Sequence, residues 1–377
     1  MAESVTRHAL ISTDFKRLLC GVDSLDLGFY VRWPNNWNLL KERFQILKDQ
    51  ANSKKGVIDK TPDGRVFLHR PSGKPPNYRF HLQFPEYHLF IATTNPADKY
   101  PNVFVSFNSE TLWALDIEKA VDLVRHDLSH FNCKVQRIQP SRVDLAIDYL
   151  LPSGLSLDFI MQHKVCRSRG VSHYADDTTL ETFYAGAPGG DIRLRIYDKG
   201  KEVMKSGKLW FLHLWGVDSP DNVWRVEYQV RRPTLKEFKI NTIDDLLESI
   251  GGLMSYLTGD WFSLRNNDNE QQNRRTLLPW WEDVQHAAYE LGPEIQLARQ
   301  PQGELLASVE WYVSHISGCL PSYAAKLGIK DFDQAVQRLC HDITMYWMSK
   351  DYKDELTKRM ILLGRGINGG GDEDEAA

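Results

Sequence analysis

The feature that most constrains this chain is a strict two-residue alternation in three separate segments. In DIRLRIYDK (191–199), Leu194 and Ile196 alternate with polar or charged neighbours. The segments RVDLAIDYL (142–150) and VWRVEYQV (223–230) alternate in the same way. Successive side chains of a β-strand point to opposite faces of its sheet. The three segments are therefore predicted to be strands with one apolar and one polar face.

The polar positions of these strands combine acids, bases and a phenol. Along the chain they are Arg142, Asp144, Asp148, Arg193, Arg195, Tyr197, Lys199, Arg225, Glu227 and Arg231. A solvated face is the ordinary explanation for one such strand, but three strands in one sheet would gather these groups together. Carboxylates bind Mg²⁺ or Mn²⁺, and arginine and lysine bind phosphate. A tyrosine hydroxyl beside both can attack a phosphodiester, so the pattern favours phosphoryl transfer on a nucleic acid.

The spacing of the acids limits which of them can share an ion. Asp144 and Asp148 lie four residues apart, which is roughly 13 Å on an ideal strand. We therefore expect Asp144 and Glu227 as ligands, with Asp148 a ligand only if a bulge intervenes and otherwise the partner of a base or a helix. The alternative is a set of simple ion pairs: Asp144 with Arg142 or Arg193, and Glu227 with Arg225.

The remaining pattern predicts an α+β fold, an antiparallel sheet with helices packed on one face, followed by a helical region. Further strands are expected at 25–33, 65–70, 79–84, 87–92, 102–108 and 181–186, and helices at 36–50, 109–131 and 155–163. We expect residues 1–264 to form the catalytic domain and the polar segment 265–275 to be a surface loop. Residues 276–364 are expected to be helical, and 365–377 a disordered acidic tail.

Composition restricts the setting. The 377 residues carry a formal charge of −4, so the chain is not coated in basic residues, although a local basic face is enough to bind DNA. The five cysteines are isolated, so neither a disulfide framework nor a zinc site is expected, and a reducing compartment fits best. The N-terminus lacks the apolar core of a signal peptide, and no apolar run is long enough to span a bilayer. We expect a cytoplasmic protein without a membrane partner.

Three stretches together resemble a known family. SRVDLAIDY (141–149), LETFYAGAPGGDIRLRIYDKGKE (180–202) and NVWRVEYQVRR (222–232) occur in this order. They resemble the replication initiation factor family, which includes rolling-circle initiators of the small staphylococcal plasmid type, relaxases of conjugative elements and some phage replication proteins. The resemblance covers roughly residues 100–235. It implies a degenerate, rearranged HUH-endonuclease-like sheet and an enzyme that nicks one strand at an origin, joining a tyrosine to the 5′ phosphate and leaving a free 3′ hydroxyl.

The resemblance also implies roles for individual residues. The motif R-I-Y-x-K-x-x-E stands here as Arg195, Ile196, Tyr197, Lys199 and Glu202, which makes Tyr197 the nucleophile. Asp144, Glu227 and Asp148 would serve Mg²⁺ or Mn²⁺, and the DNA-binding set would be Arg142, Arg193, Arg225, Tyr184 and Arg231. The cations around Tyr197 are expected to neutralise the scissile phosphate and lower the pKa of the phenol. Tyr184 is the rival nucleophile, with packing or DNA stacking as its alternative role.

Two departures from the family pattern bear on these roles. Some plasmid initiators carry a glutamate in the strand where this chain has Ser106, which puts a metal role for that strand in doubt. The family's T-x-Y-x-G-x-R stretch stands here as TFYAGAPGG (182–190), without the arginine, so Arg193 is a candidate to supply that phosphate contact.

Three functions fit these observations. The first is an origin nickase and religase that starts rolling-circle replication, or a conjugative relaxase with the same chemistry. The others are a non-catalytic DNA-binding module and a metal-dependent hydrolase that uses water. The expected partner is origin DNA, single-stranded or hairpin, with a host helicase and a second copy of the chain as further candidates. Residues 321–347 resemble a helix-turn-helix, and an ordinary helical hairpin is the alternative.

Overall fold

The computed structural model describes residues 13–93, 100–176, 179–292, 309–348 and a few positions between 350 and 357. The chain divides into two compact units, Met1–Arg299 and Gln300–Ala377. The first unit combines a large sheet with helices, and the second contains a pair of helices. The predicted α+β class is thus confirmed for the first unit.

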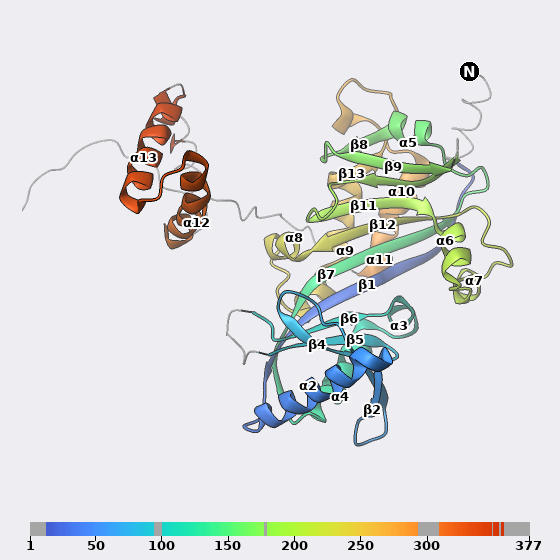
Figure 1. The fold of residues 1–377 in the computed structure, drawn as a ribbon. Helices are drawn as coiled ribbons and strands as arrows, with labels where there is room; N and C mark the ends of the chain where they lie inside the picture. Colours follow the sequence, from blue (N-terminus) through green and yellow to red (C-terminus); the bar gives the residue numbers. More distant parts are fainter. Residues whose placement is uncertain are drawn as a thin grey trace, which may run out of the picture. The chain divides into compact units, whose positions relative to one another are not determined.

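A single antiparallel sheet organises the described part of the first unit, with the order β2-β3-β4-β5-β6-β1-β7-β12-β11-β10-β9 (Figure 1). The strands are β1 Lys16–Arg32, β2 Val57–Lys60, β3 Val66–Arg70, β4 Tyr78–Gln83, β5 Tyr87–Ala92, β6 Val103–Phe107, β7 Lys134–Leu150, β9 Val171–Asp176, β10 Thr179–Ala185, β11 Ile192–Asp198 and β12 Val223–Arg231. The long strands β1 and β7 pair in the middle. A second small sheet pairs β8 (Lys164–Cys166) with β13 (Phe262–Leu264).

One face of the large sheet is apolar and is covered by helices. These are α2 (Trp37–Lys54), α4 (Ile117–Ser129), α9 (Ile243–Tyr256), α10 (Pro279–His286) and α11 (Ala288–Leu291). Phe44 of α2 packs on Phe80 of β4, with ring centroids 5.6 Å apart. Burial of this face accounts for the apolar half of the alternation read from the sequence.

The opposite face is polar, and helices also cover one end of it. Around this end lie α3 (Ser109–Ala114), α6 (Lys199–Ser206) and α7 (Trp210–Trp215), which build a second apolar cluster around Phe211 and Trp215. Figure 1 shows α6 and α7 beside the end of the sheet. The expectation that helices pack on one face alone was therefore wrong at this end.

The helix predicted over residues 109–131 is two helices, α3 and α4. Leu115 is extended between them, and the Asp116 carboxylate accepts a hydrogen bond from the backbone N–H of Lys119 at 2.7 Å. An N-cap aspartate satisfies a backbone donor that a helix leaves unpaired at its start. The apolar spacing that runs across both helices hid this break.

The boundary between the units also differs from the expected one at 264–276. Trp280 and Trp281 of α10 are fully buried in the first unit. Trp280 packs edge-on against Tyr149 of β7 at 5.8 Å, and Trp281 lies 5.2 Å from Phe262. Two large indoles that bury against the sheet bring α10 into the first unit, although the polar loop before them does lie on the surface.

Short helices α5 (Leu157–His163) and α8 (Arg232–Glu237) complete the connections of the first unit. In the second unit, α12 (Val309–Leu327) and α13 (Phe332–Met348) form a helical hairpin that turns at Gly328, where φ is +69°. The Tyr323 hydroxyl donates to the Asp342 carboxylate across the hairpin at 2.6 Å. The predicted acidic tail lies outside the described residues. No helix in the described part of the chain is long and apolar enough to cross a membrane.

Candidate active site

Strand register decides which polar side chains meet. β12 pairs with β7 so that Glu227 lies opposite Ala146 and Gln229 lies opposite Asp144. Asp144 and Glu227 are therefore diagonal neighbours on the polar face, a separation across which side chains reach one another. β11 pairs with β12 so that Arg195 lies directly opposite Glu227. The sequence predicted a shared face, and the register brings these three residues together on it.

Tyr197 lies at the centre of the open part of this face. Its hydroxyl donates a hydrogen bond to Glu227 Oε2 at 3.0 Å, and Arg195 forms an ion pair with Glu227 Oε1. The Arg195 guanidinium and the Lys199 ammonium lie 5.6 and 5.8 Å from the centre of the Tyr197 ring. We call the set Tyr197, Arg195, Glu227 and Lys199 the open cluster, because all four line one cavity of about 480 Å³.

The pKa of Tyr197 does not follow the expectation. Burial and the negative charge of Glu227 raise the pKa of the phenol well above its usual value, and the nearby arginines offset this in part. The expected lowering by cations was wrong because the hydroxyl donates to a carboxylate, which favours the protonated form. Tyr197 is thus held as a neutral phenol whose proton already points at a base.

Asp144 pairs with Arg142 rather than with Arg193. The guanidinium donates through Nε to Asp144 Oδ1 at 2.8 Å and through a second nitrogen to Oδ2. Burial, together with repulsion from Glu227, raises the pKa of Asp144 to about 6 even beside Arg142. A carboxyl group whose ionisation is made costly by burial and by a neighbouring carboxylate is stabilised in its charged form by a nearby cation.

This donor set fits the expected metal. Mg²⁺ and Mn²⁺ are commonly held by one or two carboxylates, with water and substrate phosphate completing the shell. Glu227 supplies one such group beside the tyrosine, and Asp144, its diagonal neighbour, supplies the second. A bound divalent cation would polarise the phosphate, and the raised pKa of Asp144 is the observation in this chain that agrees with that role.

Lys199 is the first residue of α6, and this position keeps its side chain near the Tyr197 ring. Its side chain is 3% exposed, it pairs with Glu202, and burial lowers its pKa. The next residue must be glycine, since a Cβ at Gly200 would lie 1.9 Å from the carbonyl oxygen of Pro220. This close approach places the first turn of α6 against a neighbouring loop. It explains why glycine follows the lysine in the R-I-Y-x-K motif of this chain.

Asp148 and Arg225 belong to a different arrangement, which we call the closed cluster together with Asp23. Arg225 is fully buried and donates to Asp148 at 2.5 and 2.8 Å and to Asp23 at 2.5 Å. Trp215 Nε1 donates to the same Asp148 carboxylate at 2.8 Å. The assignment of Arg225 to DNA binding was therefore wrong, because DNA cannot reach it. The two groups that hold Asp148, Arg225 and Trp215, are both buried, whereas the Arg142 side chain that holds Asp144 is partly exposed. The contacts of Asp148 therefore agree with its alternative role of orienting a base and a helix.

Cationic and aromatic groups surround the open cluster. The Arg193 guanidinium lies 4.0 Å from the centre of the Tyr184 ring. Arg231 is not one of them, because it lies at the end of β12, six residues beyond Arg225, where it donates to Gln229 Oε1 at 3.3 Å. Lys201, Lys205 and Lys208 line the cavity beside Tyr184. The cavity thus places one tyrosine beside the carboxylates and another at the rim, under a guanidinium.

Sequence reasoning missed two acids of β1. Asp23 lines the cavity and takes part in the closed cluster, and Asp26 lies opposite Arg142 in the register. The Ser106 hydroxyl donates to Asp26 at 2.5 Å, so a carboxylate from β1 lies beside Ser106 of β6. The segment VDSLDLG contained the signal, but a bulge at Asp23 breaks its alternation.

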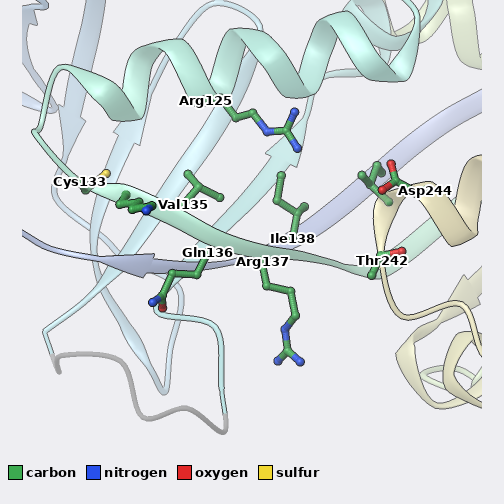
Figure 2. A pocket seen from close by; sticks show the side chains of 10 residues that line it. Arg125, Cys133, Val135, Gln136, Arg137, Ile138, Thr242 and Asp244 are labelled. Atoms are coloured by element: carbon green, nitrogen blue, oxygen red, sulfur yellow. The ribbon is translucent and has the colours of Figure 1, made fainter.

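A second hollow, of about 590 Å³, lies where α4 passes over the start of β7 (Figure 2). Its lining contains Arg125, Arg137 and Asp244, but no tyrosine. Its lining includes the thiol of Cys133, which could act as a nucleophile only as a thiolate. Burial raises the pKa of that thiol to about 12. This hollow therefore lacks the combination of groups found around Tyr197.

Comparisons with known proteins found similar chains among solved structures. No family model matches the chain, and no curated protein matches it. Among solved structures, the chain is similar to the rolling circle replication initiator protein from Geobacillus stearothermophilus, with a TM-score of 0.43 and 17% sequence identity. The match covers 75% of this chain and 100% of that one.

Proposed function

We propose that this protein is a replication initiator that nicks one DNA strand at an origin through a covalent link to Tyr197 and later religates it. One observation carries the proposal: the Tyr197 hydroxyl donates to Glu227 inside a cavity that also holds Arg195 and Lys199. A nucleophile hydrogen-bonded to a base, with cations at the reacting centre, is the arrangement that phosphoryl transfer requires.

The proposed step balances within these residues. The Tyr197 oxygen forms a bond to the scissile phosphorus while the bond from phosphorus to the 3′ oxygen breaks. The phenolic proton passes to Glu227 Oε2, and Lys199, whose pKa is lowered, donates a proton to the leaving 3′ oxygen. The products are a 5′-phosphotyrosine and a free 3′ hydroxyl. Religation is the reverse, with a 3′ hydroxyl displacing the tyrosine.

We propose that the phosphate is neutralised by Arg195, Arg142 and Arg193, since guanidinium groups form bidentate hydrogen bonds to phosphate. A Mg²⁺ or Mn²⁺ ion on Asp144 and Glu227 would add Lewis-acid polarisation. Tyr184 is proposed as a stacking surface for a base, because Arg193 already covers one side of its ring. The helical hairpin α12–α13 is proposed to read the origin, and a host helicase to unwind the nicked duplex.

The test uses the full chain with Mn²⁺ and single-stranded DNA from candidate origins of its own genetic element. A covalent adduct would migrate slowly on a denaturing gel. We expect the adduct in wild type and in Tyr184→Phe, and none in Tyr197→Phe, which loses one hydroxyl and little volume. An adduct that persists in Tyr197→Phe and disappears in Tyr184→Phe would show that Tyr184 is the nucleophile.

Two further results of the same assay would overturn the proposal. Cleavage without any adduct would indicate a hydrolase that uses water. DNA binding without cleavage, across all origin candidates, would indicate a non-catalytic binding module. Filter binding with Tyr197→Phe separates these cases, since that variant is expected to bind DNA as wild type does.

A further inference from the structure

A second group of ligand side chains lies far from the open cluster. Asp63 belongs to the turn between β2 and β3, His126 to the last turn of α4, and His130 directly follows that helix. Asp63 Oδ2 lies 2.8 Å from His126 Nε2, and Asp63 Oδ1 lies 3.2 Å from His130 Nε2. The two imidazole nitrogens are 3.3 Å apart. Within the described residues, no other three such side chains converge in this way.

These separations match the edges of a metal coordination shell. Zinc binds histidine nitrogen and carboxylate oxygen at about 2.0–2.2 Å, so adjacent ligands of a tetrahedral ion lie roughly 3.3–3.5 Å apart. The nitrogen–nitrogen distance of 3.3 Å and one nitrogen–oxygen distance of 3.2 Å agree with this. The remaining edge, 2.8 Å from Asp63 to His126, needs only a small rotation of an exposed carboxylate.

The elements that carry the ligands are fixed by their own contacts. Asp127, next to His126, is buried and accepts hydrogen bonds from Arg65 at 2.8 Å and from the Tyr87 hydroxyl at 2.5 Å. Arg65 directly follows the turn that holds Asp63. The end of α4 and the β2–β3 turn are thus tied together before any ion binds. Such preorganisation reduces the cost of assembling a site.

The carboxylate is also oriented by a neighbouring side chain. The Thr61 hydroxyl donates a hydrogen bond to Asp63 Oδ1. A partner that orients a ligating carboxylate is typical of metal sites. Thr61 also ties the turn together, since its backbone N–H donates to the Arg65 carbonyl at 2.9 Å.

This group cannot serve Tyr197. α4 covers the apolar face of the sheet, whereas Tyr197 lies on the polar face. Seven strand positions separate β3 from β11 in the sheet order, which is on the order of 30 Å at the usual strand spacing. An ion bound here would instead cross-link the β2–β3 hairpin to the end of α4.

We propose that Asp63, His126 and His130 form a site for Zn²⁺ or a similar transition ion, with three protein ligands and a fourth position open to solvent. Two imidazoles and one carboxylate suit zinc better than Mg²⁺, which prefers an all-oxygen shell. The cysteine pattern gave no sign of this site, because its signal is the H-x-x-x-H spacing at 126–130 together with a distant aspartate.

The test uses tag-free full-length protein carrying Tyr197→Phe, so that nicking chemistry plays no part in the result. Zn²⁺ is titrated against a chromogenic chelator, and Co²⁺ is followed by its visible absorption. We expect one tightly bound equivalent, a cobalt spectrum typical of tetrahedral nitrogen and oxygen ligation, and a melting temperature raised by Zn²⁺. His126→Gln and Asp63→Asn should each weaken Zn²⁺ binding by at least about 100-fold, because removing a ligand costs no less than removing the group that orients it.

The matched control is His81→Gln. His81 and His88 form another histidine pair, with nitrogens 2.8 Å apart, on the polar face and outside the group of three. This variant should bind Zn²⁺ as the parent does. Absence of micromolar binding in the parent would overturn the proposal, as would equal binding in His126→Gln and Asp63→Asn. Circular dichroism of the variants, whose replaced side chains are partly exposed, separates loss of the site from loss of fold.

Discussion

The open and closed clusters each pair an arginine with a carboxylate and share strand β12, but they differ in the exposure of that arginine. The Arg195 side chain is 35% exposed, whereas that of Arg225 is fully buried. Glu227 and Arg225 lie two residues apart in β12, and both face the polar side. Arg195 and Tyr197 meet Glu227 in a cavity, whereas Arg225 is sealed between Asp148, Asp23 and Trp215. Helices α6 and α7 cover one end of the face and leave the rest open. Burial therefore decides which acid–base pair can meet a substrate and which one holds the fold together.

The largest effect is expected from Arg225→Met. The change leaves the buried Asp148 and the partly exposed Asp23 without their cation, and we expect a loss of about 3–5 kcal/mol of unfolding free energy in urea denaturation. Arg195→Met should cost less, about 1–2 kcal/mol, since water can enter the cavity and solvate Glu227. Equal losses in the two variants would remove the distinction between the clusters.

Glu227→Gln tests the chemical half of the comparison. We expect adduct formation to fall by about 100-fold or more because the phenol loses the base that accepts its proton, while stability stays close to wild type. Asp148→Asn should do the reverse, lowering stability while folded molecules keep most of their nicking rate. A nicking rate that Glu227→Gln leaves intact would exclude Glu227 as the base.

The pH dependence of stability sharpens the same contrast. The folded protein holds the pKa of Asp144 at about 6, above its usual value of 3.8, so the folded state binds this proton more tightly than the unfolded chain does. The associated stability is present below pH 4 and is lost as pH rises through 6. In metal-free buffer, wild type should lose on the order of 2–3 kcal/mol relative to Asp144→Asn across this window. Parallel stability curves for the two proteins would contradict the assignment.

The smallest effect is expected at the rim of the cavity. Lys205→Ala and Lys208→Ala should each weaken binding of single-stranded DNA by a few-fold and lower the salt dependence by about one unit of slope. Lys119→Ala, on the exposed side of α4, provides the control and should change neither quantity. Fluorescence anisotropy over a range of salt concentrations measures both. A salt slope that all three variants share with wild type would place the DNA path elsewhere.

Alternation was enough to predict the polar face but not the pairing on it. The strands at 142–150, 191–199 and 223–230 lie side by side, and Asp144, Glu227 and Tyr197 share a face as the pattern predicted. The pattern could not show that Arg195, rather than Arg225, would meet Glu227. Cross-strand register depends on turns and bulges, which leave little trace in a two-residue period.

Burial by distant segments was equally hidden. Trp215 of α7 covers Asp148, and no local feature of 142–150 indicates that a tryptophan so far along the chain will do so. The same holds for Trp280, which brings α10 onto the sheet. Contacts of this kind arise from tertiary packing. A single sequence therefore predicts the strand but not which distant side chains pack against it.

The bulge in β1 has a consequence for how such a chain tolerates change during evolution. Between Val22 and Ser24 the register shifts, and the extra residue, Asp23, reaches Arg225. Deleting one residue here would restore a regular ladder, yet it would remove a counter-charge from the sealed arginine. Related chains should therefore accept substitutions along β1 more readily than insertions or deletions, and the length of this strand should vary less than its composition.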